Sequence, residues 1–158
     1  MAKEASTPLD RTDLKLLRLL QRDGRLSNAD LAAKAGVSAA TCHRRTQRLF
    51  EAGYLTGVRG MVDPQRVGLG TLVIVGVVLD RSTPDSFAAF EAAVKKLKFV
   101  IDCHVVAGDF DYFLKLRVSD IADFNRLHGS ELLALPGVRQ TRTFFVLKEV
   151  IDAAPLVF

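Results

Sequence analysis

Three arginines lie within one five-residue stretch, at Arg44, Arg45 and Arg48, and no acidic residue occurs between Ser38 and Phe50. A guanidinium group binds phosphate oxygens, and it can also donate two hydrogen bonds to the O6 and N7 atoms of guanine. A cationic segment of this kind is typical of a helix that lies in the major groove of DNA. The alternative for each arginine is a solvated surface charge.

Small and polar neighbours extend this segment into a candidate DNA-contacting surface. Ala40 lets the backbone approach base edges closely, and the amide of Gln47 suits adenine. Hydroxyl groups and first-turn amides near the two helix starts suit phosphate oxygens. We expect Arg44 to read bases and Arg45 to bind phosphate. The full set of expected DNA contacts is Ser27, Asn28, Ser38, Ala40, Thr41, His43, Arg44, Arg45, Gln47 and Arg48.

The sequence Gly108-Asp109-Phe110-Asp111 is the second candidate site. Its simplest interpretation is a tight hairpin turn, because glycine permits a positive φ and aspartate accepts hydrogen bonds from nearby backbone amides. On residue chemistry alone this structural interpretation is the more economical one.

Other candidate chemistry is weaker. Asp102 and His104 share one face of a predicted strand, where a surface or interface hydrogen-bonding pair is a simpler interpretation than an acid–base pair. Cys42 and Cys103 belong to no CxxC motif or Cys/His cluster, and we interpret both as small core residues. The sequence has no phosphate-binding glycine loop, no nucleophile–base–acid set and no metal ligands at workable spacing. We therefore expect no enzyme activity, no metal and no cofactor.

Three short helices must position the arginines. Caps and apolar spacing predict these helices over residues 10–22, 27–35 and 38–52, with Asp10, Ser27 and Ser38 as their N-caps. Gly36 suits the left-handed conformation with which a helix ends sharply. In the third helix, the inward stripe is Cys42, Thr46 and Leu49. The outward face is Ala40, His43, Arg44 and Gln47, with Arg45 and Arg48 beside it.

The remainder of the chain alternates between strand and helix patterns. We expect strands over Leu72–Leu79, Phe99–Ala107, Asp111–Val118 and Val138–Val150. One helix is expected to start at Ser82, Thr83 or Pro84 and another at Asp120. The order β-α-β-β-α-β is the split ferredoxin-like pattern, with two helices on one face of one sheet. The alternating segment Tyr54–Val62 suggests a further strand.

Charge and composition support a division into two domains. Residues 1–53 hold ten Lys/Arg and six Asp/Glu, whereas residues 54–158 hold twelve of each, so the net charge of +4 lies in the first third. That asymmetry favours a polyanion-binding N-terminal domain. We expect a flexible N-terminus at 1–8, a DNA-binding domain at 9–55, a linker strand and hinge at 56–70, and a separate C-terminal domain at 71–158.

Two further patterns bear on location and partners. MAKEASTP lacks the apolar run of a signal peptide, and the longest apolar run, Leu72–Leu79, is too short to span a bilayer, so we expect a cytoplasmic protein with no membrane partner. The strands carry large apolar groups at odd and even positions, yet two helices cover only one sheet face. We expect a second copy to cover the other face; the alternative is that Tyr54–Val62 or the N-terminal domain folds over it.

Four segments carry a resemblance to a known family, in the family's order: LDRTDLKLLRLLQRDGRLSNADLA, AGVSAATCHRRTQRLFEAGYL, GDFDYFLKLRV and LPGVRQTRTFFVLKEV. From about Leu9 to Val150 the chain resembles the Lrp/AsnC transcription regulators of bacteria and archaea. The resemblance implies an α+β fold, with a winged-type helix-turn-helix domain of three helices and a ferredoxin-like βαββαβ domain. It also implies sequence-specific binding to double-stranded DNA, an amino-acid effector, and homodimers that assemble to octamers or other higher oligomers.

The same resemblance implies an effector pocket at the loop 108–111. An amino acid needs an acceptor for its ammonium group, which Asp109 or Asp111 would supply, and backbone amides for its carboxylate. The expected effector contacts, which suggest an apolar or aromatic ligand, are Val105, Gly108, Asp109, Phe110, Asp111, Phe144, Phe145 and Val146. The alternative function is an enzyme on the same architecture, similar to siroheme decarboxylases. That alternative would need conspicuous His and Arg groups in the C-terminal cleft, where the sequence offers His104 and His128.

Overall fold

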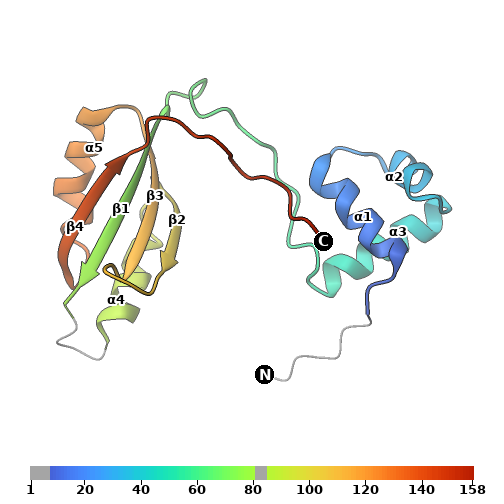
Figure 1. Cartoon of the computed structure of the whole chain (residues 1–158), viewed down its shortest axis with the longest axis horizontal. Helices are drawn as coiled ribbons and strands as arrows, with labels where there is room; N and C mark the ends of the chain where they lie inside the picture. Colours follow the sequence, from blue (N-terminus) through green and yellow to red (C-terminus); the bar gives the residue numbers. More distant parts are fainter. Residues whose placement is uncertain (1–7, 81–84) are drawn as a thin grey trace. The chain divides into compact units, whose positions relative to one another are not determined.

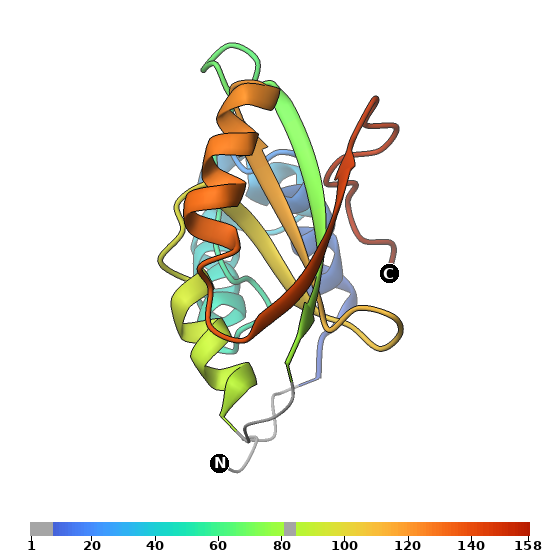
Figure 2. The same cartoon turned by 90° about the vertical axis from the view of Figure 1, so that its left-hand side faces the viewer.

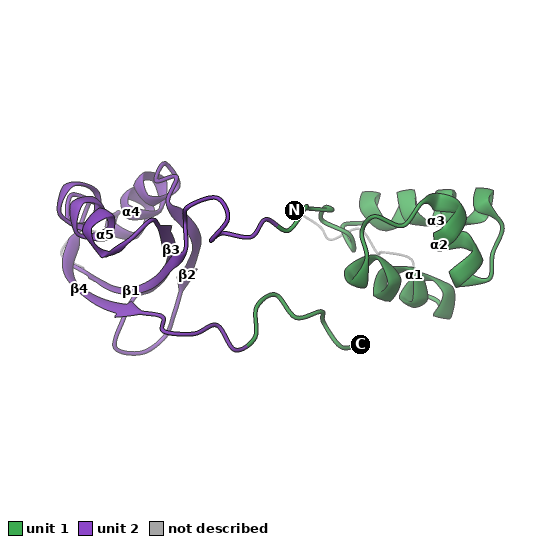
Figure 3. Cartoon of the chain, turned by 90° about the horizontal axis from the view of Figure 1, so that it is seen from above, with its two compact units in different colours: residues 1–61, 151–158 green, residues 62–150 purple. Residues whose placement is uncertain are grey.

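The computed structural model describes residues 8–80 and 85–158, and these form two compact units (Figure 3). Unit 1 comprises the chain up to Met61 together with Ile151–Phe158, and unit 2 comprises Val62–Val150. The last eight residues therefore group with the N-terminal unit, although the sequence suggested that they belong to the C-terminal domain. Apart from Pro8, the expected flexible N-terminus lies outside the described residues.

Unit 1 contains three helices, α1 (Arg11–Arg22), α2 (Asn28–Ala35) and α3 (Ala39–Glu51) (Figure 1). The predicted N-caps are confirmed, because each cap side chain accepts a hydrogen bond from the backbone N–H three residues later. Gly36 ends α2 with a φ of +77°, the left-handed conformation expected from the sequence. The winged-type part of the prediction has no counterpart, because no strand occurs in the described part of unit 1.

The core of unit 1 consists of small and branched apolar side chains from all three helices. Its buried members are Leu16, Leu17, Leu31, Ala32, Ala35, Cys42 and Leu49. Cys42 is completely buried, which confirms its interpretation as a core residue. These contacts fix α3 against the other two helices and leave its opposite side in solvent.

Unit 2 has the predicted ferredoxin-like order. Its elements are β1 (Thr71–Leu79), α4 (Ser86–Val94), β2 (Val100–Val105), β3 (Tyr112–Val118), α5 (Ile121–Leu127) with a π-helical turn η1 (His128–Leu132), and β4 (Val138–Phe145). The strands pair antiparallel in the order β2-β3-β1-β4. Figure 2 shows α4 and α5 on the same side of this sheet.

Some expected elements differ from the structure. The last strand ends at Phe145 rather than Val150. Phe145 pairs with Val73, and β1 begins only two residues earlier, so the residues after Phe145 have few residues of β1 left to pair with. Tyr54–Val62 forms no strand. No described strand lies beside it, so its backbone has no partner for the hydrogen bonds of a sheet. The expected start of α4 at residues 82–84 lies outside the described residues.

The two faces of the sheet have different surroundings. Val73, Val75 and Val77 of β1 are buried in the core with Phe90 of α4 and Phe124 of α5. The alternate residues of β1 lie on the other face, which neither helix covers. Cys103 was expected in the core but is exposed, because β2 is an edge strand that pairs only with β3.

A hollow of about 450 Å³ lies on this open face of the sheet. It is lined by Ile74, His104, Phe113, Leu114, Lys115 and Phe144. Ile74 lies opposite both Lys115 and Phe144 in the ladder, and with His104 of β2 the side chains of all four strands line the hollow. The predicted uncovered apolar surface of the sheet is therefore present. None of the described helices is long and apolar enough to cross a membrane.

Candidate nucleic-acid interface and effector pocket

One side of α3 presents a row of exposed residues at helical spacing. Ala40, His43, Arg44 and Gln47 are all exposed, while Cys42 and Leu49 on the opposite side are buried. The predicted orientation of this helix is confirmed for these residues. Spacings of three and four residues keep the row on one face, which is the arrangement that a major-groove helix requires.

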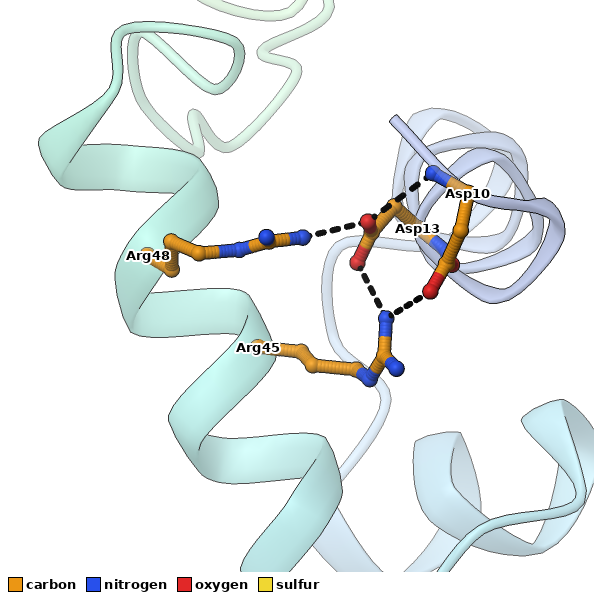
Figure 4. A network of polar contacts seen from close by, with 4 residues as sticks. All are labelled: Asp10, Asp13, Arg45 and Arg48. Carbon is orange, nitrogen blue, oxygen red and sulfur yellow. Dashed lines mark hydrogen bonds and ion pairs between the residues drawn. The ribbon is translucent and has the colours of Figure 1, made fainter. Parts of the chain in front are cut away.

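Arg45 and Arg48 point instead toward α1, where they meet two carboxylates (Figure 4). Arg45 Nη1 lies 2.6 Å from Asp10 Oδ2 and 2.9 Å from Asp13 Oδ1. Arg48 Nη2 pairs with the second oxygen of Asp13, whose side chain is completely buried. The Asp13 carboxylate also accepts a hydrogen bond from the Asp10 N–H, as part of the capping box of α1. We call these four residues the α1–α3 charge network.

The charges in this network stabilise one another. Burial alone would raise the pKa of Asp13, but the hydrogen bonds from the Asp10 N–H, Arg48 and Arg45 together outweigh it and lower that pKa. The pKa of Asp10 is lowered first by the Asp13 N–H and then by Arg45. In return, the hydrogen bonds to Asp10 and Asp13 raise the pKa of Arg45.

The network corrects one inference from the sequence. No acid between Ser38 and Phe50 neutralises the arginines, but Asp10 at the N-cap of α1 and Asp13 within α1 do, more than thirty residues earlier in the chain. Arg45 and Arg48 are therefore engaged inside unit 1, and the phosphate contact expected of Arg45 and the DNA contact expected of Arg48 lose their support. The residues in the sequence that could have indicated this network are Asp10 and Asp13, which the sequence analysis assigns only to helix capping.

Acid should weaken unit 1 through this network. Because the folded pKa of Asp13 lies below its ordinary value of 3.8, the network contributes its full stability above about pH 4, and that contribution falls as pH drops through the folded pKa. We expect the difference in free energy of unfolding between wild type and Asp13→Asn to be large at pH 7 and to shrink below pH 4. Urea denaturation followed by circular dichroism measures it; a difference that is constant from pH 7 to pH 3 would contradict the assignment.

The polar residues at the helix starts bind neighbouring parts of unit 1. Ser38 Oγ accepts from the Thr41 N–H at 3.2 Å and lies 3.0 Å from the Thr41 hydroxyl. Asn28 Nδ2 donates to the Ala39 carbonyl over 2.9 Å and thereby joins the start of α2 to the start of α3. Ser27 Oγ donates to the Asp30 carboxylate at 2.6 Å. These groups position α3, and their expected phosphate contacts stay predictions.

The loop 106–111 connects β2 to β3 as the predicted hairpin. Gly108 has a φ of +146°, and the Val106 N–H donates to the Asp111 carbonyl over 3.0 Å. Asp111 is buried, and its Oδ2 accepts from the Leu79 N–H at 2.8 Å. The Asp111 N–H donates to Val77 of β1 as well, so this residue anchors the loop to the end of β1.

A cavity of about 430 Å³ opens where this loop meets β1 and β4. It is lined by Val78, Leu79, Asp80, Asp109, Asp111 and Arg139. Asp109 and Arg139 are both exposed and bring opposite charges to one cavity. The sequence analysis missed Arg139 and Asp80. The predicted strand order already makes the first and last strands neighbours, but the register shift that leaves Arg139 unpaired between the Val78–Gln140 and Leu79–Val138 pairs needs coordinates.

The other expected effector residues are spread over different surfaces. Phe144 lines the hollow on the open face, whereas Phe145 packs edge-on against Phe124 on the helix side, with ring centres 5.2 Å apart. The two phenylalanines therefore face opposite ways, as consecutive residues of a strand must. Phe110 covers Gly76, where an added Cβ would lie 2.7 Å from its ring. Val105 is exposed at the end of β2, and the Val146 N–H donates to Leu72.

Comparisons with known proteins cover both units. Residues 9–49 match the AsnC-type helix-turn-helix domain, and residues 72–156 match the Lrp/AsnC ligand binding domain. The leucine-responsive regulatory protein of Haemophilus influenzae is 45% identical over 150 residues, which cover 95% of this chain and 90% of that protein. The leucine-responsive regulatory protein of Escherichia coli K12 is 42% identical over 155 residues, which cover 98% of this chain and 94% of that protein.

Solved structures give the same result. A transcriptional regulator of Neisseria meningitidis in complex with L-methionine superposes with a TM-score of 0.89 at 32% identity, over 94% of this chain and 97% of that one. AsnC of Escherichia coli superposes with a TM-score of 0.83 at 25% identity, over 92% and 97% of the two chains. Because these similar proteins are regulators of transcription, they give no support to the siroheme-decarboxylase alternative.

Proposed function

The chain belongs to the Lrp/AsnC family, and from this premise we propose which of its residues perform the work of a transcriptional regulator. It is a DNA-binding regulator of transcription that responds to an amino acid, as the family does. The proposal assigns DNA reading to α3 of unit 1 and effector binding to the cavity of unit 2. It also places the protein in the cytoplasm, as expected for a DNA-binding regulator of this family.

Unit 1 reads DNA with the exposed row of α3. Arg44 donates two hydrogen bonds to guanine and Gln47 pairs with adenine, while Ala40 and His43 contact neighbouring base edges. The observation that carries this assignment is the division among the arginines: Arg44 is exposed, whereas Arg45 and Arg48 are held by α1. Ser27, Asn28, Ser38 and Thr41 support this surface at the two helix starts.

Unit 2 binds its effector in the cavity between the loop 106–111, β1 and β4. Asp109 accepts the ammonium group and Arg139 donates to the carboxylate, because an amino acid carries both charges and the cavity offers both partners. Asp111 is less suited to the ammonium group, since one of its oxygens is already bound to the Leu79 N–H. Val78 and Leu79 supply apolar lining for the side chain of the ligand.

Leucine and methionine are the first effectors to test. Two similar proteins are named for leucine, and one similar structure holds L-methionine. Both ligands have apolar side chains that are unbranched at the β-carbon, and Val78 and Leu79 are the apolar residues that line the cavity.

We expect leucine or methionine to raise the melting temperature of the wild type by a few degrees, and Asp109→Asn or Arg139→Gln to abolish most of that shift. A ligand at one hundred times its Kd stabilises by about 2.7 kcal/mol, and the loss of one charged partner removes much of it. Differential scanning fluorimetry with all twenty amino acids measures the shift, with Glu131→Gln as the control for a lost surface charge. If both cavity variants respond like the wild type, the effector binds elsewhere.

The open face of the sheet forms the homodimer. Its hollow gathers apolar groups of β1, β3 and β4 on a surface that α4 and α5 leave uncovered. Dimers then assemble to an octamer or another higher oligomer, as the family likeness implies. A dimer presents two copies of α3, so its DNA site has two-fold symmetry.

Selection of bound DNA from a random pool, with and without leucine or methionine, tests the function as a whole. We expect a two-fold symmetric site whose recovery changes when the effector is present. Recovery of random sequence with steep salt dependence would instead indicate a DNA compactor without base reading.

A further inference from the structure

The last eight residues of the chain dock on α1. Arg18 Nε donates to the main-chain oxygen of Phe158 over 2.6 Å, and Arg18 Nη2 donates to the same oxygen. The guanidinium carbon of Arg18 lies 5.5 Å from the centre of the Phe158 ring, which is a cation–π distance. One side chain of the DNA-binding unit therefore contacts both the backbone and the ring of Phe158.

Gln21, one turn farther along α1, makes a paired contact with Leu156. The Leu156 N–H donates to Gln21 Oε1 over 2.9 Å, and Gln21 Nε2 donates to the Leu156 carbonyl over 3.3 Å. The Gln21 amide thus satisfies the N–H and the carbonyl of Leu156, as the backbone of a neighbouring strand would. Together with Arg18 it gives the tail four polar contacts on one helix.

An apolar groove lies beside these contacts. A cavity of about 390 Å³ is lined by Leu9, Leu17, Tyr54 and Leu55, and Leu156 and Phe158 of the tail line it too. Leu156 is 74% exposed and Val157 is fully exposed, whereas Phe158 is 43% exposed, so the ring of Phe158 is the apolar group of the tail that the groove covers most. Because the tail buries little area, its docking is suited to open and close.

The docked tail leaves the DNA-reading row of α3 free. Asp13 marks the side of α1 that faces α3, and Arg18 lies about 140° around the helix axis from it. A tail bound there does not cover Arg44 or Gln47, which are exposed. The contact therefore restrains the DNA-binding unit without blocking it.

The chain passes from unit 1 to unit 2 at Met61 and returns to unit 1 at Ile151. We propose that Ile151–Phe158 is a strap, latched by Arg18 and Gln21, that joins the DNA-binding unit to the effector-binding unit a second time. This inference rests on the proposed function. A single linker lets the DNA-binding unit rotate relative to the effector-binding unit, whereas two connections restrict that rotation. The latched strap therefore favours one spacing between the two DNA half-sites that a dimer binds. The strap follows β4 in the chain, and β4 carries Arg139 of the effector cavity. A change in β4 on effector binding can therefore be transmitted along the chain to the strap.

A cross-link tests the docking directly. In a Cys103→Ser background, the pair Gln21→Cys and Leu156→Cys is treated with a short bismaleimide. The control is the pair Arg11→Cys and Leu156→Cys, in which the helix position lies about 15 Å nearer the start of α1. We expect the first pair to link efficiently within one chain and the control pair to link poorly. Equal linking of both pairs, or links chiefly between two chains, would overturn the proposal.

The function of the strap is measured on duplexes that carry two copies of the selected half-site at varied spacing. We expect the cross-linked protein to prefer its best spacing at least about fivefold over one shifted by half a turn, and Arg18→Ala/Gln21→Ala to prefer it less than about twofold. Both should bind a single half-site as the wild type does. Identical spacing profiles, or a weaker single-site affinity of Arg18→Ala, would refute the strap, whereas a wild type that binds no DNA would refute the proposed function.

Discussion

Replacing Arg44 by alanine is expected to weaken binding to the selected DNA site by about 5- to 150-fold, because one bidentate contact to guanine contributes about 1–3 kcal/mol of discrimination. Binding to random DNA should fall much less, since phosphate contacts elsewhere remain. Fluorescence anisotropy with the selected duplex and a scrambled duplex measures both affinities. Arg44 is exposed and is not part of the core of unit 1. Its replacement should therefore lower DNA affinity without changing the melting temperature.

Lys15→Ala is the matched control, because it removes one exposed cation of unit 1 away from α3. It should leave discrimination unchanged and reduce the salt dependence by at most one charge. Arg45→Ala provides a second comparison: its guanidinium is paired with Asp10 and Asp13, so its loss should lower stability and leave the salt slope in place. Equal losses for Arg44→Ala on both duplexes would show that Arg44 binds phosphate only.

The local order of the chain was predictable because its signals are short-range. Asp10, Ser27 and Ser38 cap their helices through bonds to the third residue onward, a distance that sequence patterns cover directly. The exposed row of α3 followed from helical spacing in the same way. The β-α-β-β-α-β order likewise needs only periodicity and turn residues.

The contacts that the sequence could not supply join residues far apart in the chain. Asp13 and Arg48 are thirty-five positions apart, and helical spacing does not say which arginine of α3 turns toward α1. The cavity proposed for the effector has the same origin, because Asp109 and Arg139 come to line it only through the order and register of the strands. Phe144 and Phe145 are the converse case: they are neighbours in sequence and were expected at one site, but the alternation of the strand places them on opposite faces of the sheet.

Replacing Asp13 by alanine is expected to lower the free energy of unfolding of unit 1 by about 2–4 kcal/mol. The Asp13 carboxylate is completely buried and is shared by Arg45 and Arg48, so its loss leaves two guanidinium groups without their main partner. Breaking a fully buried ion pair costs about 3–5 kcal/mol, and the partial exposure of both arginines reduces that cost through hydration. The loss also removes the capping-box acceptor of the Asp10 N–H.

The Asp13→Ala variant should weaken DNA binding as well, for a reason that distinguishes it from Arg44→Ala. The α1–α3 charge network holds α3 against α1, so its loss lets α3 and its exposed row vary in orientation. The affinities for the selected and the scrambled duplex should therefore fall by similar factors. Asp13→Asn keeps the volume and an acceptor for the cap but not the charge, and it should lie between wild type and Asp13→Ala in urea denaturation. A double-mutant cycle with Arg48→Ala should give a coupling energy above about 1 kcal/mol. Additive effects of the two substitutions would mean that the Asp13–Arg48 ion pair contributes nothing to the free energy of unfolding.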